Sequence, residues 1–184
     1  MGLSRAQSLV GFRSEGRPEN DFYPTPPPMT EALLSVEKFS KDVWEPACGD
    51  GAMARVLENH GYTVVGTDVE PRGYGSVLDF FLSGYTLAPN IITNPPYRLL
   101  NDFIERAVVF QPEKIALLCK LNALETIERS KILERTKLTR VWVFRARQNI
   151  YRNGIVESDN GGMIAFCWLV WECGYQGKPE IGWI

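Results

Sequence analysis

The tetrapeptide Asn94-Pro95-Pro96-Tyr97 combines three groups that could hold a planar exocyclic amine. It follows a short apolar stretch at 90–93, which places it in a turn at the end of a predicted strand. The side-chain carbonyl of Asn94 and the main-chain carbonyl of Pro95 can each accept one N–H of an –NH2 group, while the Tyr97 ring can stack on the heterocycle. Because two prolines restrict the backbone, these groups would be preorganised to direct the nitrogen lone pair at a methyl donor.

A glycine-rich turn at 49–51 lies upstream, between a predicted strand and a predicted helix. The next apolar strand, at 63–67, is followed by Asp68. Glycine at the C-terminal end of a strand lets the backbone approach a ligand closely, and an acidic residue about 20 positions later can hold ribose hydroxyls. This layout predicts a cofactor that contains a nucleoside, bound where the two strands end.

Two classes of cofactor fit this layout. The spacing Gly49-x-Gly51-x-x-Ala54 is a loose form of the dinucleotide-binding fingerprint. However, Glu45 and Pro46 precede the glycines, and a carboxylate beside the loop would repel a pyrophosphate. It would suit S-adenosylmethionine, which carries a sulfonium and an amino group and has no phosphate. The sequence therefore favours S-adenosylmethionine over a nicotinamide cofactor.

The overall composition is that of one globular domain, with 184 residues of which 45% are hydrophobic and 23% charged. A formal net charge of −2 gives no general attraction for nucleic acid, so any such contact must come from a local patch. The cysteines lack zinc-finger spacing and the single histidine leaves little for a metal site, so no metal is expected. The cysteine usage, the absence of an apolar signal peptide and the shortness of the longest apolar run predict a cytoplasmic protein without membrane association.

The alternation of predicted strands and helices favours an α/β fold with a mostly parallel sheet and helices on both faces. Because no helix separates the last two strands, we expect them to pair antiparallel at one edge. Thr25 or Thr30 would cap the first helix. Residues 1–21 are expected to form a flexible arm, and 22–184 a single domain. Strands are predicted at 42–45, 63–67, 76–78, 91–94, 114–119, 139–144 and 162–171, and helices at 29–39, 53–60, 99–110 and 121–136.

Over residues 22–171 these motifs resemble those of class I S-adenosylmethionine-dependent amino-methyltransferases. The likeness is strongest to small DNA adenine N6-methyltransferases encoded by phages and prophages. The segment Tyr23-Pro24-Thr25-Pro26 precedes the glycine turn, which precedes the Asn-Pro-Pro-Tyr motif, and this is the order called gamma among DNA amino-methyltransferases. The resemblance implies a Rossmann-like seven-stranded sheet, mostly parallel, whose last strand is antiparallel.

The resemblance also implies roles for individual residues. Asp68 would bind the ribose hydroxyls, with Val69 beside the adenine ring of the cofactor. Asp79 would accept from the adenine amine, with Phe80 packed next to it. The target amine would be held by Asn94, Pro95, Pro96 and Tyr97. The methionine end of the cofactor would be lined by Glu45, Ala47, Gly49 and Gly51 and covered by Tyr23, Pro24, Thr25 and Pro26. Further contacts with the cofactor are expected from Pro46, Cys48 and Asn94.

Contacts to the target beyond its amine are expected from residues 145–162, between the last two strands. Larger members of the family carry a C-terminal recognition domain, whereas this sequence stops soon after its last predicted strand. Arg145, Arg147 and Arg152 could grip a phosphate backbone, and Tyr151 could stack on a flipped base. The expected partner is a nucleic acid, DNA in the first place, and a homodimer is one way for so short a chain to grip a duplex.

Three functions stay open on the sequence. The first is methylation of adenine N6 in DNA. RNA adenine methyltransferases and the glutamine methyltransferases of release factors also use Asn-Pro-Pro-Tyr, so the same chemistry could act on RNA adenine or on a protein glutamine amide. The third is a non-catalytic subunit that binds a cofactor or a partner. Cys48 is interpreted as a small turn residue, because nucleophilic C5 methylation needs a Pro-Cys pair where Asn94 stands.

Overall fold

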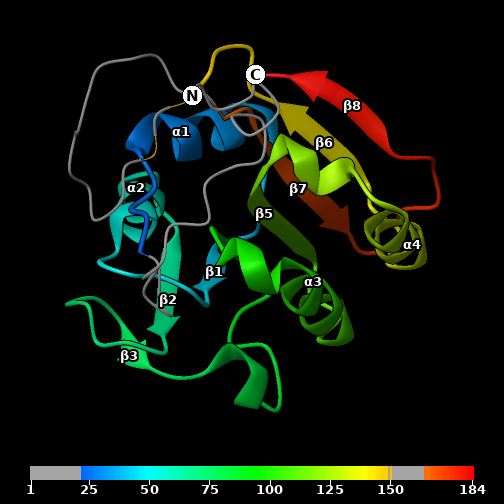
Figure 1. Ribbon diagram of the computed structural model, residues 1–184. Coiled ribbons are helices and arrows are strands. Elements are labelled where there is room, and N and C mark those ends of the chain that lie inside the picture. Colours follow the sequence, from blue (N-terminus) through cyan, green and yellow to red (C-terminus); the bar gives the residue numbers. More distant parts are fainter. Residues whose placement is uncertain (1–21, 149, 151–163) are drawn as a thin grey trace, which may run out of the picture.

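The computed structural model describes residues 22–148, 150 and 164–184. These residues form an eight-stranded sheet in the order β3-β2-β1-β4-β5-β7-β6-β8, with β3 at the lower left and β8 at the upper right of Figure 1. Neighbouring strands run parallel, except that β7 is antiparallel to both β5 and β6. The strands are β1 (Asp42–Glu45), β2 (Thr63–Asp68), β3 (Ser76–Val77), β4 (Asn90–Thr93), β5 (Lys114–Lys120), β6 (Arg140–Val143), β7 (Phe166–Glu172) and β8 (Glu180–Trp183).

The sheet confirms the predicted α/β fold class and differs from the expectation at one edge. The last two predicted strands do pair antiparallel, but β7 lies between β5 and β6 rather than at the edge. That edge is formed by an additional strand, β8, which pairs parallel with β6. A Cβ on Gly182 would lie 2.1 Å from the Trp142 ring, so the two strands pack too closely there for a side chain. This long-range packing has no counterpart in a local sequence pattern.

Helices cover both faces of the sheet, as predicted. One face carries α1 (Pro27–Val36) and α2 (Ala52–Asn59), and the other carries α3 (Leu100–Val109) and α4 (Ile127–Arg135). Side chains of β5 alternate between the two cores, since Leu117 packs with α3 and α4 while Leu118 packs with α1 and α2. Both are fully buried, as expected for a strand covered on both faces. The described residues also form three short 3-10 helices: η1 (Phe80–Leu82), η2 (Tyr97–Leu99) and η3 (Leu121–Leu124).

The single helix predicted over 121–136 is two elements. After η3 the chain extends at Glu125, and α4 begins one residue past Thr126. Thr126 has a φ of 79°, and its hydroxyl accepts from the N–H of Arg129 at 3.2 Å. The prediction missed this break because it followed the apolar periodicity, which continues across the break, and gave no weight to Thr126 as a helix cap.

Helix α1 begins at Pro27, two residues earlier than predicted, because proline is tolerated where helical N–H groups have no partner. Neither Thr25 nor Thr30 caps it, contrary to the prediction. The helix ends at Val36, and the side chain of Glu37 then accepts hydrogen bonds from β5 and β6. No helix in the described part of the chain has the length and apolar character needed to cross a membrane.

Candidate functional site

A cavity of about 430 Å³ lies at the carboxyl ends of β1, β2 and β4. In open α/β sheets, ligands bind at the carboxyl ends of the strands where the strand order reverses. Here that point is β1, which has β2 on one side and β4 on the other. Segments far apart in the sequence meet here, and most predicted residues are among those lining the cavity. These are Tyr23, Pro24, Thr25, Glu45, Pro46, Ala47, Cys48, Gly49, Asp68, Val69, Asp79, Phe80, Asn94, Pro95, Pro96 and Tyr97.

Glu45, the last residue of β1, presents a buried carboxyl group to the cavity. It is 2% exposed, and its Oε2 has no hydrogen-bond partner among the described residues. Burial raises the pKa of Glu45 well above its usual value, more than a hydrogen bond with the backbone of Ala54 lowers it. The nearby carboxylate of Asp68 adds to this rise. A cation placed in the cavity would therefore find a buried acid that lacks a counter-charge.

Asp68 joins the end of β2 to the glycine turn. Its Oδ2 accepts from the N–H of Gly49 at 2.9 Å, and its Oδ1 accepts from the N–H of Glu70 at 3.0 Å. Each carboxylate oxygen can accept a further hydrogen bond, so the side chain can hold the turn and still bind a hydroxyl in the cavity. The two interpretations of this residue, turn-forming and ligand-binding, are therefore compatible.

The two glycines of the turn have different neighbours. Gly49 has a φ of 54° and would place a Cβ 2.4 Å from the ring of Phe22, whose face is covered by the guanidinium of Arg72 at 4.8 Å. Gly51 does not line the cavity; a Cβ there would lie 2.4 Å from the ring of Tyr74. Gly49 thus lets the N-terminal segment close over the turn, whereas Gly51 makes room for an aromatic side chain that packs behind it.

Cys48 is held inside this turn. Its thiol lies 3.6 Å from the carbonyl oxygen of Tyr74. Burial, aided by the carboxylates of Glu45 and Asp68, raises the pKa of Cys48 to about 12. The thiol therefore stays protonated near neutral pH, and a nucleophilic role is disfavoured.

Asn94 directly follows β4 and faces the cavity with its amide held from behind. Its Nδ2 donates to the carbonyl oxygen of Tyr23 at 3.3 Å and to Oγ1 of Thr25 at 3.1 Å. Pro95 is buried and Thr25 is 4% exposed, so this part of the cavity wall is closely packed. The predicted amine-binding motif and the Tyr-Pro-Thr-Pro segment thus contact one another directly.

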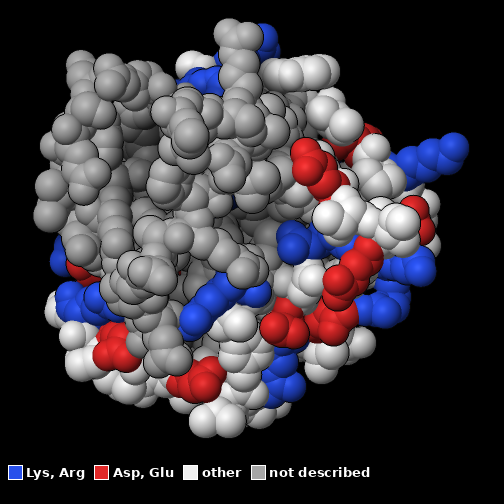
Figure 2. All heavy atoms as spheres, viewed as in Figure 1, with Lys and Arg blue, Asp and Glu red and all other residues white. Residues whose placement is uncertain are grey.

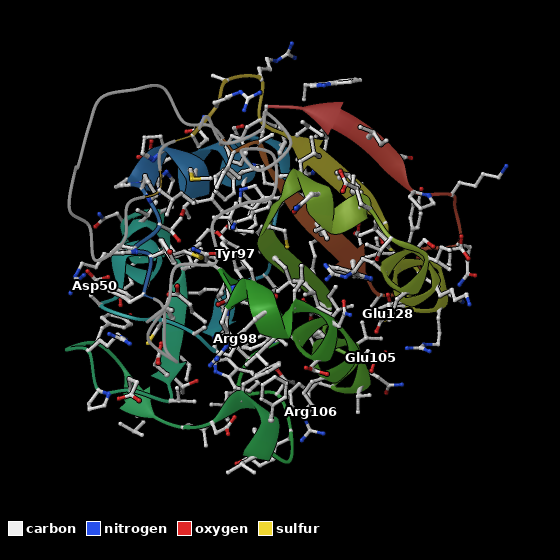
Figure 3. All side chains as sticks on the ribbon, in the orientation of Figure 1. Asp50, Tyr97, Arg98, Glu105, Arg106 and Glu128 are labelled. Atoms are coloured by element: carbon white, nitrogen blue, oxygen red, sulfur yellow. The ribbon has the colours of Figure 1, made fainter. Side chains whose placement is uncertain are left out.

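The Tyr97 ring lines the cavity together with Arg98 and Lys120, neither of which was among the predicted site residues. Tyr97 and Arg98 are labelled in Figure 3. Burial raises the pKa of the Tyr97 hydroxyl, so the ring is neutral. The ammonium of Lys120 lies 4.9 Å from the centroid of this ring, and Arg98 also lines the cavity. Lys120 could have been found as a charged residue ending a buried strand beside β4, since such positions point to the same edge of the sheet.

Charges are unevenly distributed along the cavity. The β1 and β2 end is lined by several carboxylates, Glu45, Asp50, Asp68 and Glu70, together with Arg72, while Arg98 and Lys120 lie at the β4 and β5 end. On the described part of the face in Figure 2, Lys and Arg are interspersed with Asp and Glu, so this part of the surface shows no such uneven distribution. The local asymmetry suits a cationic ligand at one end and an anionic ligand at the other.

The remaining predicted residues lie away from the cavity or outside the described residues. Pro26 is the N-cap of α1 and does not line the cavity. Arg145 and Arg147 are exposed and follow β6, at the same edge of the sheet but not in the cavity lining. Tyr151 and Arg152 lie outside the described residues, as does the expected arm at 1–21.

Asp79 and Phe80 close the cavity near its acidic end. Asp79 accepts from the N–H of Phe81 at 2.9 Å and so starts η1. Phe80 is 2% exposed and stacks on Phe103 with centroids 4.6 Å apart. Phe80 therefore contacts both the cavity and the hydrophobic core beneath α3.

No protein-family model and no curated protein sequence matches the chain. Solved structures do match it. A candidate RNA methyltransferase from Pyrococcus horikoshii superimposes with a TM-score of 0.63 and 13% identity, over 94% of this chain and 99% of that one. The modification subunit of a candidate type I restriction enzyme from Vibrio vulnificus gives 0.59 and 14% over 91% of this chain, which spans about half of that subunit (48%).

A third structure, magnesium protoporphyrin IX methyltransferase from Synechocystis with bound S-adenosylmethionine, gives a TM-score of 0.51 and 14% identity over 78% of this chain and 76% of that one. At such low identities the likeness is one of fold. The chain has the Rossmann-like fold that these methyltransferases share.

Proposed function

We propose that this protein transfers a methyl group from S-adenosylmethionine to the N6 amine of adenine in DNA. The observation that carries the proposal is that one cavity is lined by the Asn94-Pro95-Pro96-Tyr97 motif, by the turn that follows Glu45, and by Asp68. These are the groups needed for an amine, for a cationic methyl donor and for a ribose.

The residues present fit S-adenosylmethionine. The Oε2 atom of Glu45, which has no hydrogen-bond partner in the described part of the chain, suits the positive charge of its methionine end, and Asp68 retains acceptor capacity for ribose hydroxyls. Val69, half exposed at the end of β2, and Asp79 would contact its adenine. When bound, this cofactor supplies an electrophilic methyl group. The Synechocystis methyltransferase of the same fold, which holds it, supports the assignment.

The chain's own groups would hold the target amine. The Asn94 amide oxygen and the Pro95 carbonyl oxygen accept its two N–H groups, while Tyr97 stacks on the base. These interactions favour a nitrogen whose lone pair is free of the ring, and they exclude water from its surroundings. The surplus proton leaves to solvent after transfer.

A nucleic acid fits the charges of the cavity better than a protein glutamine does. Arg98 and Lys120 lie beside Tyr97, where the phosphates flanking a flipped base would enter. Arg145 and Arg147 follow β6 at the same edge of the sheet and would extend this contact, together with Tyr151 and Arg152 of the following segment. A glutamine side chain has no negative charge for these cations to bind.

RNA adenine is the alternative substrate, favoured by the similarity in fold to a candidate RNA methyltransferase over 94% of the chain. The geometry of the amine site is the same for both nucleic acids. The test is to incubate the protein with S-adenosylmethionine carrying a labelled methyl group and, in parallel, unmethylated DNA, total RNA or a protein extract. Asn94→Ala is the control, and calorimetry on the same samples measures cofactor binding.

We expect labelled N6-methyladenine in DNA, lost in Asn94→Ala while cofactor binding stays detectable through Glu45 and Asp68. Label found only in RNA or only in protein glutamine would show that DNA is not the substrate, while the proposed methyl-transfer chemistry would stand. Cofactor binding without transfer to any substrate would contradict the proposed activity and favour a non-catalytic subunit.

A further inference from the structure

We infer that Thr25 is a positioning residue for Asn94, which fixes the side-chain amide so that its oxygen, rather than its nitrogen, faces the target amine. The inference rests on the proposed function, because it assigns how the amine-binding group is oriented. It differs from the two roles predicted for Thr25, which were contact with the cofactor and capping of the first helix.

The hydrogen bonds define the orientation of the amide. Nδ2 of Asn94 lies 3.3 Å from the main-chain carbonyl oxygen of Tyr23, and that atom can only accept. The group facing it must therefore be the –NH2, which assigns an orientation that shape alone would leave ambiguous. The hydroxyl of Thr25 accepts from the same nitrogen at 3.1 Å. Both N–H groups of Asn94 thus have acceptors within the protein, which leaves Oδ1 as the amide atom that can accept from a donor in the cavity.

The orientation matters because the target also donates. An exocyclic amine presents two N–H groups and needs acceptors opposite them. If the Asn94 amide turned over, its –NH2 would face another donor, and the acceptor would be directed at the Tyr23 carbonyl oxygen. The two orientations fill nearly the same volume, so packing barely distinguishes them. The two acceptors on Tyr23 and Thr25 make the productive orientation the stable one.

The segment that carries Thr25 is suited to this role. Thr25 is 4% exposed, and its neighbours Pro24 and Pro26 restrict the backbone on both sides. Helix α1 begins directly afterwards, and its buried residues anchor the segment to the sheet. The hydroxyl does not cap this helix and is therefore available to Asn94.

The experiment compares Thr25→Val, which replaces the hydroxyl with a methyl group of similar size, with Thr25→Ser, which keeps it. Single-turnover methyl transfer is measured at saturating cofactor, together with the cofactor Kd and the Tm of each variant. Loss of a buried hydrogen-bond acceptor predicts a transfer rate reduced about tenfold or more in Thr25→Val. The cofactor Kd should change less than about threefold, and Thr25→Ser should keep most of the rate.

Three results would overturn the inference: an unchanged rate in Thr25→Val, a weakened cofactor Kd with an unchanged rate at saturation, or a rate in Thr25→Ser as low as in Thr25→Val. A readout independent of activity covers a variant that fails to fold. In the wild type, the Asn94 side-chain –NH2, identified in the NMR spectrum by its loss in Asn94→Ala, should exchange with solvent much more slowly than that of the exposed Asn59. Equally fast exchange would refute the hydrogen bonds that orient Asn94, even if methyl transfer is never detected. Slow exchange without methyl transfer would contradict only the proposed function.

Discussion

Glu37 and Glu45 are both buried glutamates, 3% and 2% exposed, at opposite edges of the same sheet. Glu37 accepts from Lys114 at 2.8 Å, from Trp142 at 2.9 Å and from Arg140. Burial alone would raise the pKa of Glu37, but these hydrogen bonds, led by that from Arg140, outweigh it and hold the pKa below its usual value. Glu45 has an oxygen without a partner in the described part of the chain, and its pKa is raised.

The difference shows how a buried carboxyl group can be assigned to structure or to function. At the amino edge, where β5 and β6 begin, the charge of Glu37 is matched within the protein, so the group ties α1 to the sheet. At the carboxyl ends of the strands, Glu45 has a hydrogen bond with the backbone of Ala54 but no ion-pair partner among the described residues, so the group is costly to ionise until a cation binds. The two glutamates are equally buried, so the difference lies in the hydrogen-bond and ion-pair partners that each carboxylate has.

The largest effect is expected at Glu37. Replacing it with alanine removes the buried acid of Lys114 and Arg140 and leaves them the more exposed Glu172 as an ion-pair partner, and should lower the free energy of unfolding by about 3 kcal/mol in urea denaturation. Because the pKa of Glu37 is lowered, its contribution is present above pH 4.5, the usual pKa of the group, and is lost as the pH falls through the folded-state pKa. The wild-type and Glu37→Gln curves should therefore converge in acid.

The matched control is Glu105→Ala, which removes an ion pair with Arg135 between two more exposed side chains. Its cost should be below about 1 kcal/mol. A loss at Glu105 as large as that at Glu37 would show that burial of the pair is not what matters.

The second effect tests how tightly the carboxyl edge is packed. Gly51→Ala combines a positive φ of 82° with a clash against Tyr74 and should destabilise the protein by about 2–3 kcal/mol. Gly61→Ala has a similar φ of 87° but open space around the new methyl group, and should cost about 1 kcal/mol. Thermal unfolding of both variants separates the packing contribution from the backbone strain; equal losses would mean that Tyr74 moves aside freely.

A third, smaller effect has the opposite sign. In the ligand-free protein, Glu45→Gln should raise the free energy of unfolding by about 1 kcal/mol at neutral pH, because it removes the charge that burial disfavours. Since the pKa of Glu45 is raised, the wild type loses stability as the pH rises above 4.5, so the advantage of the variant should vanish in acid. The same variant should bind S-adenosylmethionine at least about tenfold more weakly in calorimetry. Higher stability with unchanged affinity would remove Glu45 from the cofactor site.

The smallest effect concerns Thr126, which lies between η3 and α4. Its φ of 79° is unfavourable for a β-branched residue, while its hydroxyl caps α4. Thr126→Gly should relieve the backbone strain but remove the capping hydroxyl. The free energy of unfolding should therefore rise by less than about 1 kcal/mol. A clear loss in denaturant titration would show that the cap outweighs the strain.

Much of the fold follows from patterns along the chain. Buried apolar stretches such as 114–119, alternating with amphipathic helices, require a parallel sheet covered on both faces, and turns at the ends of such strands must meet at one edge. For this reason the sequence alone indicated that Asn94, Glu45 and Asp68 would share a cavity, and the structure places them together. Their binding roles stay predictions.

Only the tertiary structure determined which groups these residues contact. Thr25 and Asn94 are 69 positions apart, and Trp142 and Gly182, whose pairing accommodates β8, are 40 positions apart. Likewise, no local pattern predicts that Lys120 lies over the Tyr97 ring or that the Tyr74 ring packs against Gly51. Hydrophobic periodicity records the direction in which a side chain points, because neighbours along the chain set it. Hydrogen-bond partners and close contacts depend on how the finished elements pack, and so the sequence determined the place of the site while the tertiary structure decided how its groups are held.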